Sequence, residues 1–139
     1  MRYVLDTSVL VAAVRSNVGM SNKLLEAALT RKFVVVATNT LFTEYEAVLK
    51  RPEHLNASGL DVNDIDILLD TLETVLVKVS PSFLWRAQLR DPNDDMVLEA
   101  AINGRADAIV TFNIKDFGVV PGRFNIGLLR PKEAMDQLV

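Results

Sequence analysis

The chain has 139 residues, 50% of them hydrophobic, and it contains no cysteine and a single histidine, His54. Disulfides and thiolate zinc sites are therefore excluded, and one histidine disfavours His-rich metal sites and Ser-His catalysis. The net charge of −3 and the pI near 5.1 disfavour a passive nucleic-acid coat, because such proteins rely on overall positive charge. Any catalytic chemistry therefore depends on carboxylates.

Length and hydropathy predict one soluble domain over residues 1–139. A chain of this size can bury its own core, and no repeat, low-complexity tract or linker divides it. No apolar run reaches the roughly 18 residues of a membrane helix, and the N-terminus lacks the basic-then-apolar pattern of a signal peptide. These features predict a cytoplasmic protein with no membrane contact.

Strand-like and helix-like segments alternate along the chain. Short apolar, β-branched runs predict strands at residues 3–5, 33–37, 76–79, 108–111 and 124–128. Apolar residues at helical spacing predict helices at residues 8–14, 20–30, 41–49, 64–76, 91–105 and 132–138. The alternation predicts the α/β class: a three-layer α/β/α sandwich with a central parallel sheet of four to five strands.

The helix after the second strand has recognisable end signals. Asn39 or Thr40 is expected to cap its start, and Pro52 to end it. Residues 53–62 are polar and predict a loop that contains His54. The helices on either side of this loop would then form an inserted helical hairpin.

The first strand ends on an acid, Asp6, which two hydroxyl residues follow, Thr7 and Ser8. A strand that is apolar on both sides belongs in the middle of a covered sheet, and the carboxyl edge of such a sheet is where α/β proteins bind ligands. Asp6 is therefore expected to be the first member of an acidic site. Alone, it would be explained better as the N-cap of the next helix, because Asp is a favoured N-cap residue.

Further acids fall near the same edge. Glu44 lies on the first or second turn of the helix that leaves the second strand, flanking its buried stripe. At the start of the helix over residues 91–105, Asp91 is the expected N-cap, and Pro92 takes the first helical position. On a helical wheel Asp94 is nearest the buried face and Asp95 lies at its margin, so the wheel does not choose between these two acids.

A fourth segment follows the strand that ends at Thr111. In the stretch TFNIKDF, Thr111, Asn113 and Asp116 all lie just beyond the carboxyl end of that strand. Acids gathered at one edge repel each other unless a cation binds between them. Hard oxygen ligands without His or Cys suit Mg²⁺ or Mn²⁺, which can activate water against a phosphodiester.

Three stretches together resemble the PIN domains, and more closely those that act as toxins in bacterial toxin-antitoxin pairs. They are VLDTSVLVAA, LFTEYEAVLKRP and DPNDDMVLEAAINGRADAIVTFNIKDF, and their order and spacing cover nearly the whole chain. In the family pattern the third metal-binding acid lies sixteen positions before the strand-ending Thr, which is Asp95 here. Many members have Asp where this chain has Asn113, and this departure places a second metal ion in question.

The resemblance implies a metal-dependent endoribonuclease that cleaves single-stranded RNA. Asp6, Glu44 and Asp95 would hold Mg²⁺ or Mn²⁺, and Asp116 could contribute through a water molecule. The residues expected to orient these ligands or the phosphate are Thr7, Ser8, Asp94, Thr111 and Asn113. The resemblance also implies a possible antitoxin whose Arg or Lys reaches the acids. It implies a homodimer too, and the apolar content of the helices over residues 20–30 and 64–76, which exceeds what one small sheet covers, favours the same expectation.

Other interpretations compete with this one. A haloacid-dehalogenase phosphatase needs a second Asp, and this chain has Ser8 at that position. A receiver domain needs an acid at the end of a central strand, and the second predicted strand does not end on one, so this alternative is rejected. The remaining alternative is a PIN domain without turnover that binds RNA or a partner, and Asn113 is its only support. Surface solubility explains the basic residues as well as RNA contact does; these are Arg31, Lys32, Lys50 and Arg51. Trp85 is expected to be packed.

Overall fold

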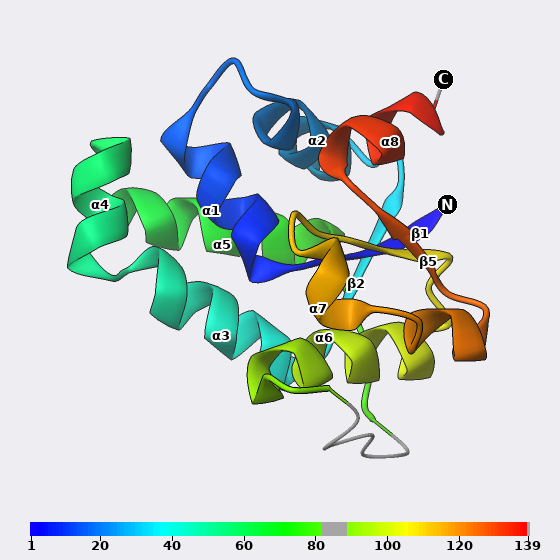
Figure 1. Cartoon of the computed structure of the whole chain (residues 1–139). Helices are drawn as coiled ribbons and strands as arrows, with labels where there is room; N and C mark the ends of the chain where they lie inside the picture. Colours follow the sequence, from blue (N-terminus) through cyan, green and yellow to red (C-terminus); the bar gives the residue numbers. More distant parts are fainter. Residues whose placement is uncertain (82–88, 139) are drawn as a thin grey trace.

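The protein is described by a computed structural model that covers residues 1–81 and 89–138 (Figure 1). The prediction that Trp85 is packed therefore lies outside the described residues. In the part of the chain that is described, no helix is both long and apolar enough to cross a membrane.

Five strands form one parallel sheet in the order β3-β2-β1-β4-β5. The strands are β1 (Arg2–Leu5), β2 (Val34–Ala37), β3 (Val77–Lys78), β4 (Ala108–Val110) and β5 (Gly127–Leu129). The strand order places β1 at the centre, with β2 and β3 on one side and β4 and β5 on the other. The chain adds β2 and β3 on one side of β1 and then crosses to add β4 and β5 on the other side. The edge of the sheet at such a switch point is where open α/β sheets bind ligands.

Helices cover the sheet. They are α1 (Thr7–Arg15), α2 (Met20–Leu29), α3 (Asn39–Leu49), α4 (Pro52–Ser58), α5 (Val62–Val75), α6 (Pro92–Asn103), α7 (Ile114–Phe117) and α8 (Pro131–Asp136), with a 3₁₀ turn at Pro121–Phe124. Figure 1 shows α1, α2 and α8 on one side of β1, and α6 on the other, where it contacts β1, β2 and β4. The predicted α/β/α sandwich is confirmed.

The central strands are buried because they are apolar on both faces. Tyr3, Val4 and Leu5 have no exposed surface, and neither has Ile109 or Val110. At roughly 25 cal/mol per Å² of apolar surface, burial on this scale dominates the favourable free energy of folding. The position of β1 is therefore firmly fixed, and so is the residue that follows it.

Two predicted ends around α3 are wrong. Its N-cap is Thr38, whose hydroxyl accepts a hydrogen bond from the Leu41 amide at 3.1 Å. Helix α3 already ends at Leu49, before Pro52. Pro52 instead begins α4, because proline is tolerated in a first helical turn. His54 consequently lies on a helix and not in a loop.

The last strand is also displaced from its predicted range. Residues 124–128 were expected to form it, but Phe124 closes the 3₁₀ turn, and β5 begins at Gly127. Asn125, between the two, adopts a left-handed conformation with φ of 60°. Because that conformation interrupts an extended chain, the strand can begin only after it.

One hydrogen bond connects α3 to the end of β1. The Tyr45 hydroxyl, which is fully buried, donates to the Leu5 carbonyl oxygen. A buried phenol requires such a partner, and this one fixes α3 beside the residue that precedes Asp6. Glu44, the neighbour of Tyr45, is positioned by the same contact.

Candidate active site

The strand register explains why Asp6 and Thr111 meet. Leu5 of β1 pairs with Val110 of β4, so the next residue of each strand emerges at the same level of the carboxyl edge. The Asp6 amide donates to the Val110 carbonyl at 2.9 Å, and the Thr111 hydroxyl donates to Asp6 Oδ2 at 2.6 Å. Asp6 is 7% exposed, and Thr111 is fully buried.

Asp6 occupies the N-cap position of α1 but does not act as its cap. Its side chain accepts no hydrogen bond from the helix backbone. It accepts one from the Ser8 hydroxyl at 2.9 Å, again at Oδ2, in addition to the bond from Thr111. Two hydroxyls therefore orient this carboxylate through one oxygen, and the simple capping explanation does not describe it.

A pocket of about 360 Å³ opens beside Asp6. Its walls come from the end of β1 and the start of α1, from α3, from the α3–α4 corner, from the first turn of α6 and from Asn113. Its acidic and basic lining residues are Asp6, Glu44, Arg51, His54, Asp91 and Asp94. Four separate segments thus bring charged groups to one edge of the sheet; three of them were predicted, and the α3–α4 corner was not.

The structure separates the two acids that the helical wheel left open. Asp94 lines the pocket together with Asp6 and Glu44, whereas Asp95 is not among its lining residues. Asp95 Oδ1 accepts a hydrogen bond from the Leu89 amide at 3.0 Å, so this carboxylate holds the segment that leads into α6. Both acids are buried, with 8% of Asp94 and 4% of Asp95 exposed.

The pKa of the Asp94 carboxyl is raised from 3.8 to about 7, chiefly by burial and next by the negative charge of Asp6. The charges of Asp91, Asp116 and Asp95 contribute in decreasing order. A carboxylate disfavoured in this way gains from any cation that neutralises its surroundings. Perturbed carboxyl groups in a cleft are typical of functional sites.

The groups after β4 divide between two pockets. Asn113 lines the pocket beside Asp6, and its amide donates to the Thr111 hydroxyl at 2.9 Å. Asp116, one helical turn later, is exposed and lines a neighbouring hollow together with Asn113 and Arg130. Asp116 therefore acts on Asp94 through its charge and does not share its pocket.

The described residues contain no group of three His, Cys, Asp or Glu side chains close enough to hold a metal ion. The expected convergence of Asp6, Glu44 and Asp95 on one point is not seen. The donors that do line the pocket still suit Mg²⁺ or Mn²⁺, because such ions retain several waters and need only one or two protein carboxylates. Asp6 and Asp94 supply these, and burial together with the charge of Asp6 raises the pKa of Asp94.

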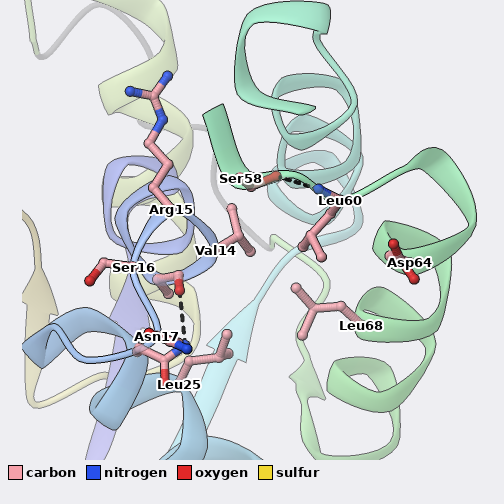
Figure 2. A pocket seen from close by; sticks show the side chains of 11 residues that line it. Val14, Arg15, Ser16, Asn17, Leu25, Ser58, Leu60, Asp64 and Leu68 are labelled. Atoms are coloured by element: carbon pink, nitrogen blue, oxygen red, sulfur yellow. Dashed lines mark hydrogen bonds between the residues drawn. The ribbon is translucent and has the colours of Figure 1, made fainter. Parts of the chain in front are cut away.

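A larger cavity lies elsewhere in the described part of the chain, between α1, α2, α4 and α5 (Figure 2). It measures about 670 Å³, and among its described lining residues Asp64 is the acid. The Asp64 carboxylate accepts from the Asp61 amide at 3.1 Å in the capping box of α5. Its acid is thus already used to cap a helix, so size alone does not identify the active site.

A protein-family model, the PIN domain, matches residues 2–115, which carry β1, the acids of the pocket and the end of β4. The chain belongs to the PIN domain family. PIN domains are generally nucleases and typically bind divalent metal ions. No curated protein matches the chain.

Sequence reasoning missed part of the lining of this PIN-domain pocket. Arg51 and His54 line it, although one was weighed as a surface cation and the other placed in a loop. The signal that could have indicated them is Pro52, which is as typical of a helix start as of a helix end.

Proposed function

We propose that this PIN domain is a metal-dependent endoribonuclease that cleaves phosphodiester bonds of single-stranded RNA. The observation that carries the proposal is the pocket at the carboxyl end of β1, where Asp6, Glu44 and Asp94 share one opening. A carboxylate fixed at the switch point of a parallel sheet, beside a second one with a raised pKa, is a typical setting for metal-assisted hydrolysis.

Mg²⁺ or Mn²⁺ would be held by Asp6 and Asp94, with Glu44 at the wall of the same pocket. When bound, the cation supplies Lewis-acid activation of water and of the phosphate. The family pattern assigns the third acid to Asp95. Because Asp95 is engaged with the Leu89 amide, we assign the pocket role to Asp94 and the support of the α6 entry to Asp95.

The hydroxyls around Asp6 have a defined part in this proposal. Ser8 and Thr111 both donate to Oδ2, which leaves Oδ1 without a hydrogen bond from the described residues. A carboxylate held in this way presents one free oxygen in a fixed direction, which is how neighbouring groups orient a metal ligand. The Asn113 amide donates to Thr111 and extends the support to the segment after β4. Thr7 follows Asp6 in the pocket lining and contributes to the same wall.

The test is cleavage of a fluorescently labelled single-stranded oligoribonucleotide. Cleavage should require Mn²⁺ or Mg²⁺, stop with excess chelator, and fall at least about a hundredfold in Asp6→Asn, as expected when an oriented charged group is removed from an active site. Cleavage that persists in chelator or in Asp6→Asn would refute the mechanism. Metal-dependent RNA binding without cleavage would favour the alternative, a binding module without turnover, which the Asn113 position favours.

The biological setting is part of the same proposal. We propose that the protein acts in the cytoplasm as the toxin of a toxin-antitoxin pair, with an antitoxin whose Arg or Lys enters the acidic pocket. Support comes from the resemblance and from the excess of acids in the pocket. A short neighbouring reading frame whose product binds this chain and blocks cleavage is the expected finding, and its absence would favour a housekeeping nuclease.

A further inference from the structure

An arginine and a histidine side chain line the acidic pocket. Arg51 and His54 come from the corner between α3 and α4, and they line the same opening as Asp6 and Asp94. Arg51 is exposed, and His54 is half-buried. The pocket therefore has an acidic wall at the sheet edge and a second wall rich in hydrogen-bond donors.

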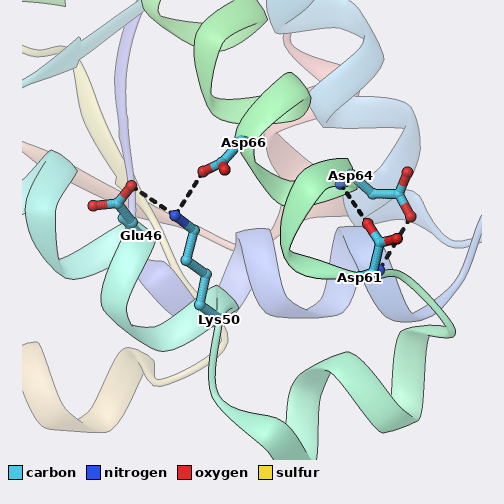
Figure 3. A network of polar contacts seen from close by, with 5 residues as sticks. All are labelled: Glu46, Lys50, Asp61, Asp64 and Asp66. Atoms are coloured by element: carbon cyan, nitrogen blue, oxygen red, sulfur yellow. Dashed lines mark hydrogen bonds and ion pairs between the residues drawn. The ribbon is translucent and has the colours of Figure 1, made fainter.

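The neighbouring residue Lys50 does not belong to this second wall, because its charge is already paired elsewhere. Figure 3 shows Lys50 Nζ between two acids, at 3.0 Å from Glu46 and 2.6 Å from Asp66. Hydrogen bonds to Asp66 and then to Glu46 raise the pKa of Lys50. Its charge is therefore already satisfied, and Lys50 does not line the pocket.

Arg51, in contrast, forms no ion pair within the described part of the chain. It occupies the N-cap position of α4 but makes no capping hydrogen bond with its side chain, so it has no evident structural duty. A guanidinium that lines an acidic pocket without pairing to its acids remains available to an anionic ligand. Its planar donors suit the paired oxygens of a phosphate.

His54 is held by a third residue. Arg15, the last residue of α1, places Nη2 at 2.8 Å from His54 Nδ1. A guanidinium can only donate, so Nδ1 accepts in this contact, which leaves Nε2 as the ring nitrogen that can donate. In Figure 2 the Arg15 side chain extends away from Asp64 and Leu68 of the larger cavity, which leaves it free to reach His54. Arg15 thereby sets His54 as a donor through Nε2.

We propose that Arg51 and His54 bind the RNA backbone phosphate next to the one that is cleaved, and that Arg15 is a positioning residue for His54. The proposal rests on the proposed nuclease function for its substrate class. The two walls would then have different roles. The acidic wall would hold the cation, and the α3–α4 corner would hold the neighbouring phosphate by charge and hydrogen bonds.

The first experiment compares Arg51→Gln with its matched control Lys50→Gln. Both remove one positive charge from adjacent residues, but only Arg51 lines the pocket. We expect KM for a short oligoribonucleotide to rise about tenfold or more in Arg51→Gln with kcat little changed, as is typical when uniform binding is lost. Lys50→Gln should change KM less than about twofold, because Lys50 is already paired with two acids and does not line the pocket. Arg51→Lys should recover part of the loss.

Salt dependence supplies a second readout. The slope of log affinity against log salt should fall by about 0.7 in Arg51→Gln, as expected for the loss of one phosphate contact on a single strand. Binding is measured with a 2′-O-methyl oligonucleotide, which lacks the 2′-hydroxyl. Inorganic phosphate at the same concentration serves as the control for a free anion, and it should bind far more weakly than the oligonucleotide.

The single histidine permits a readout that does not depend on activity. ¹⁵N–¹H correlation spectra of the one imidazole should show the Nε2–H tautomer in the wild type, and a smaller share of that tautomer in Arg15→Gln. Addition of the 2′-O-methyl oligonucleotide with Mg²⁺ should shift the His54 signals. Unchanged His54 signals on RNA binding would overturn the role of this residue.

The outcomes separate this inference from the proposed function. Cleavage with an unaltered KM in Arg51→Gln would overturn the inference and leave the nuclease proposal standing. RNA binding that depends on Arg51 without any cleavage would support the inference and refute the nuclease proposal. If Arg51→Gln and His54→Gln weaken only a protein partner and not RNA, the wall is a partner site, and the inference is wrong.

Discussion

Asp94→Asn should make the metal-free protein more stable above neutral pH. Burial and the charge of Asp6 raise the pKa of Asp94 from 3.8 to about 7, so the folded state binds this proton more tightly than the unfolded chain does. The resulting penalty is absent below about pH 4, grows between about pH 4 and 7, and is complete above pH 7. A neutral amide at this position removes it.

The size of the effect follows from the same pKa. The difference corresponds to at most about 4 kcal/mol, but the pocket is open to water, and solvent screening reduces a charge effect severalfold. Asp94 also lies in the first turn of α6, where loss of its charge costs about 0.5 kcal/mol of helix-dipole stabilisation. We therefore expect a net gain of about 1 kcal/mol, or about 3 to 5 °C in Tm.

The assay is thermal unfolding in chelator-treated buffer at about pH 5 and about pH 8.5, with Asp95→Ala as the neighbouring comparison. Asp94→Asn should gain stability only at the higher pH. Asp95→Ala should lose about 1 to 3 kcal/mol at both, because the Leu89 amide loses its acceptor. If Asp94→Asn is less stable than the wild type at the higher pH, the assignment of Asp94 to the pocket is wrong.

Three further predictions concern the metal ion, the packing and the assembly. Mn²⁺ at about 100 times its Kd should stabilise the wild type by about 2.7 kcal/mol, and calorimetry should show almost no such gain in Asp6→Asn. Gly104→Ala should cost about 1 to 3 kcal/mol in urea unfolding, because the new Cβ would lie 2.2 Å from Val36 Cγ1; a cost below about 0.5 kcal/mol would contradict this packing. We expect a homodimer by light scattering, and a concentration-independent monomer mass would refute it. The apolar stripes of α2 and α5 do not themselves demand this dimer, because their main residues are buried within the chain.

The sheet and the first acid could be predicted from the sequence because both follow from local pattern. Apolar runs of β-branched residues have few alternatives to a buried parallel strand, and the acid after the first run must then lie at its carboxyl edge. The meeting of Asp6 with Thr111 follows once β1 and β4 are neighbours in register. Pattern and topology thus determined this part of the site.

The α3–α4 corner could not be predicted in this way. Helix α4 buries none of its residues, so it shows no apolar stripe by which a helix is recognised. What fixes it is tertiary, including the hydrogen bond between Arg15 and His54, two residues far apart in the sequence. The same limit explains why the donors on this wall of the pocket were not expected.

Sequence periodicity also could not choose between Asp94 and Asp95. Consecutive helical residues lie 100° apart, and both positions flank the buried face of α6, so periodicity cannot separate them. The deciding contact is the Leu89 amide, which precedes the helix and takes Asp95 as its acceptor. Only a tertiary arrangement of the entering chain could supply that information.

A protein with a net charge of −3 that acts on RNA must create its attraction locally. The acidic wall alone would repel phosphate, and burial, followed by the charge of Asp6, already raises the pKa of Asp94 within it. A divalent cation would reverse the sign at Asp6 and Asp94, and Arg51 supplies positive charge beside them from a different element. Arg51 alone does not outweigh the acidic wall at long range, so it does not draw in RNA before the cation is in place. Binding of the cation would therefore come before binding of RNA, and the order of these two events follows from the charges of the pocket.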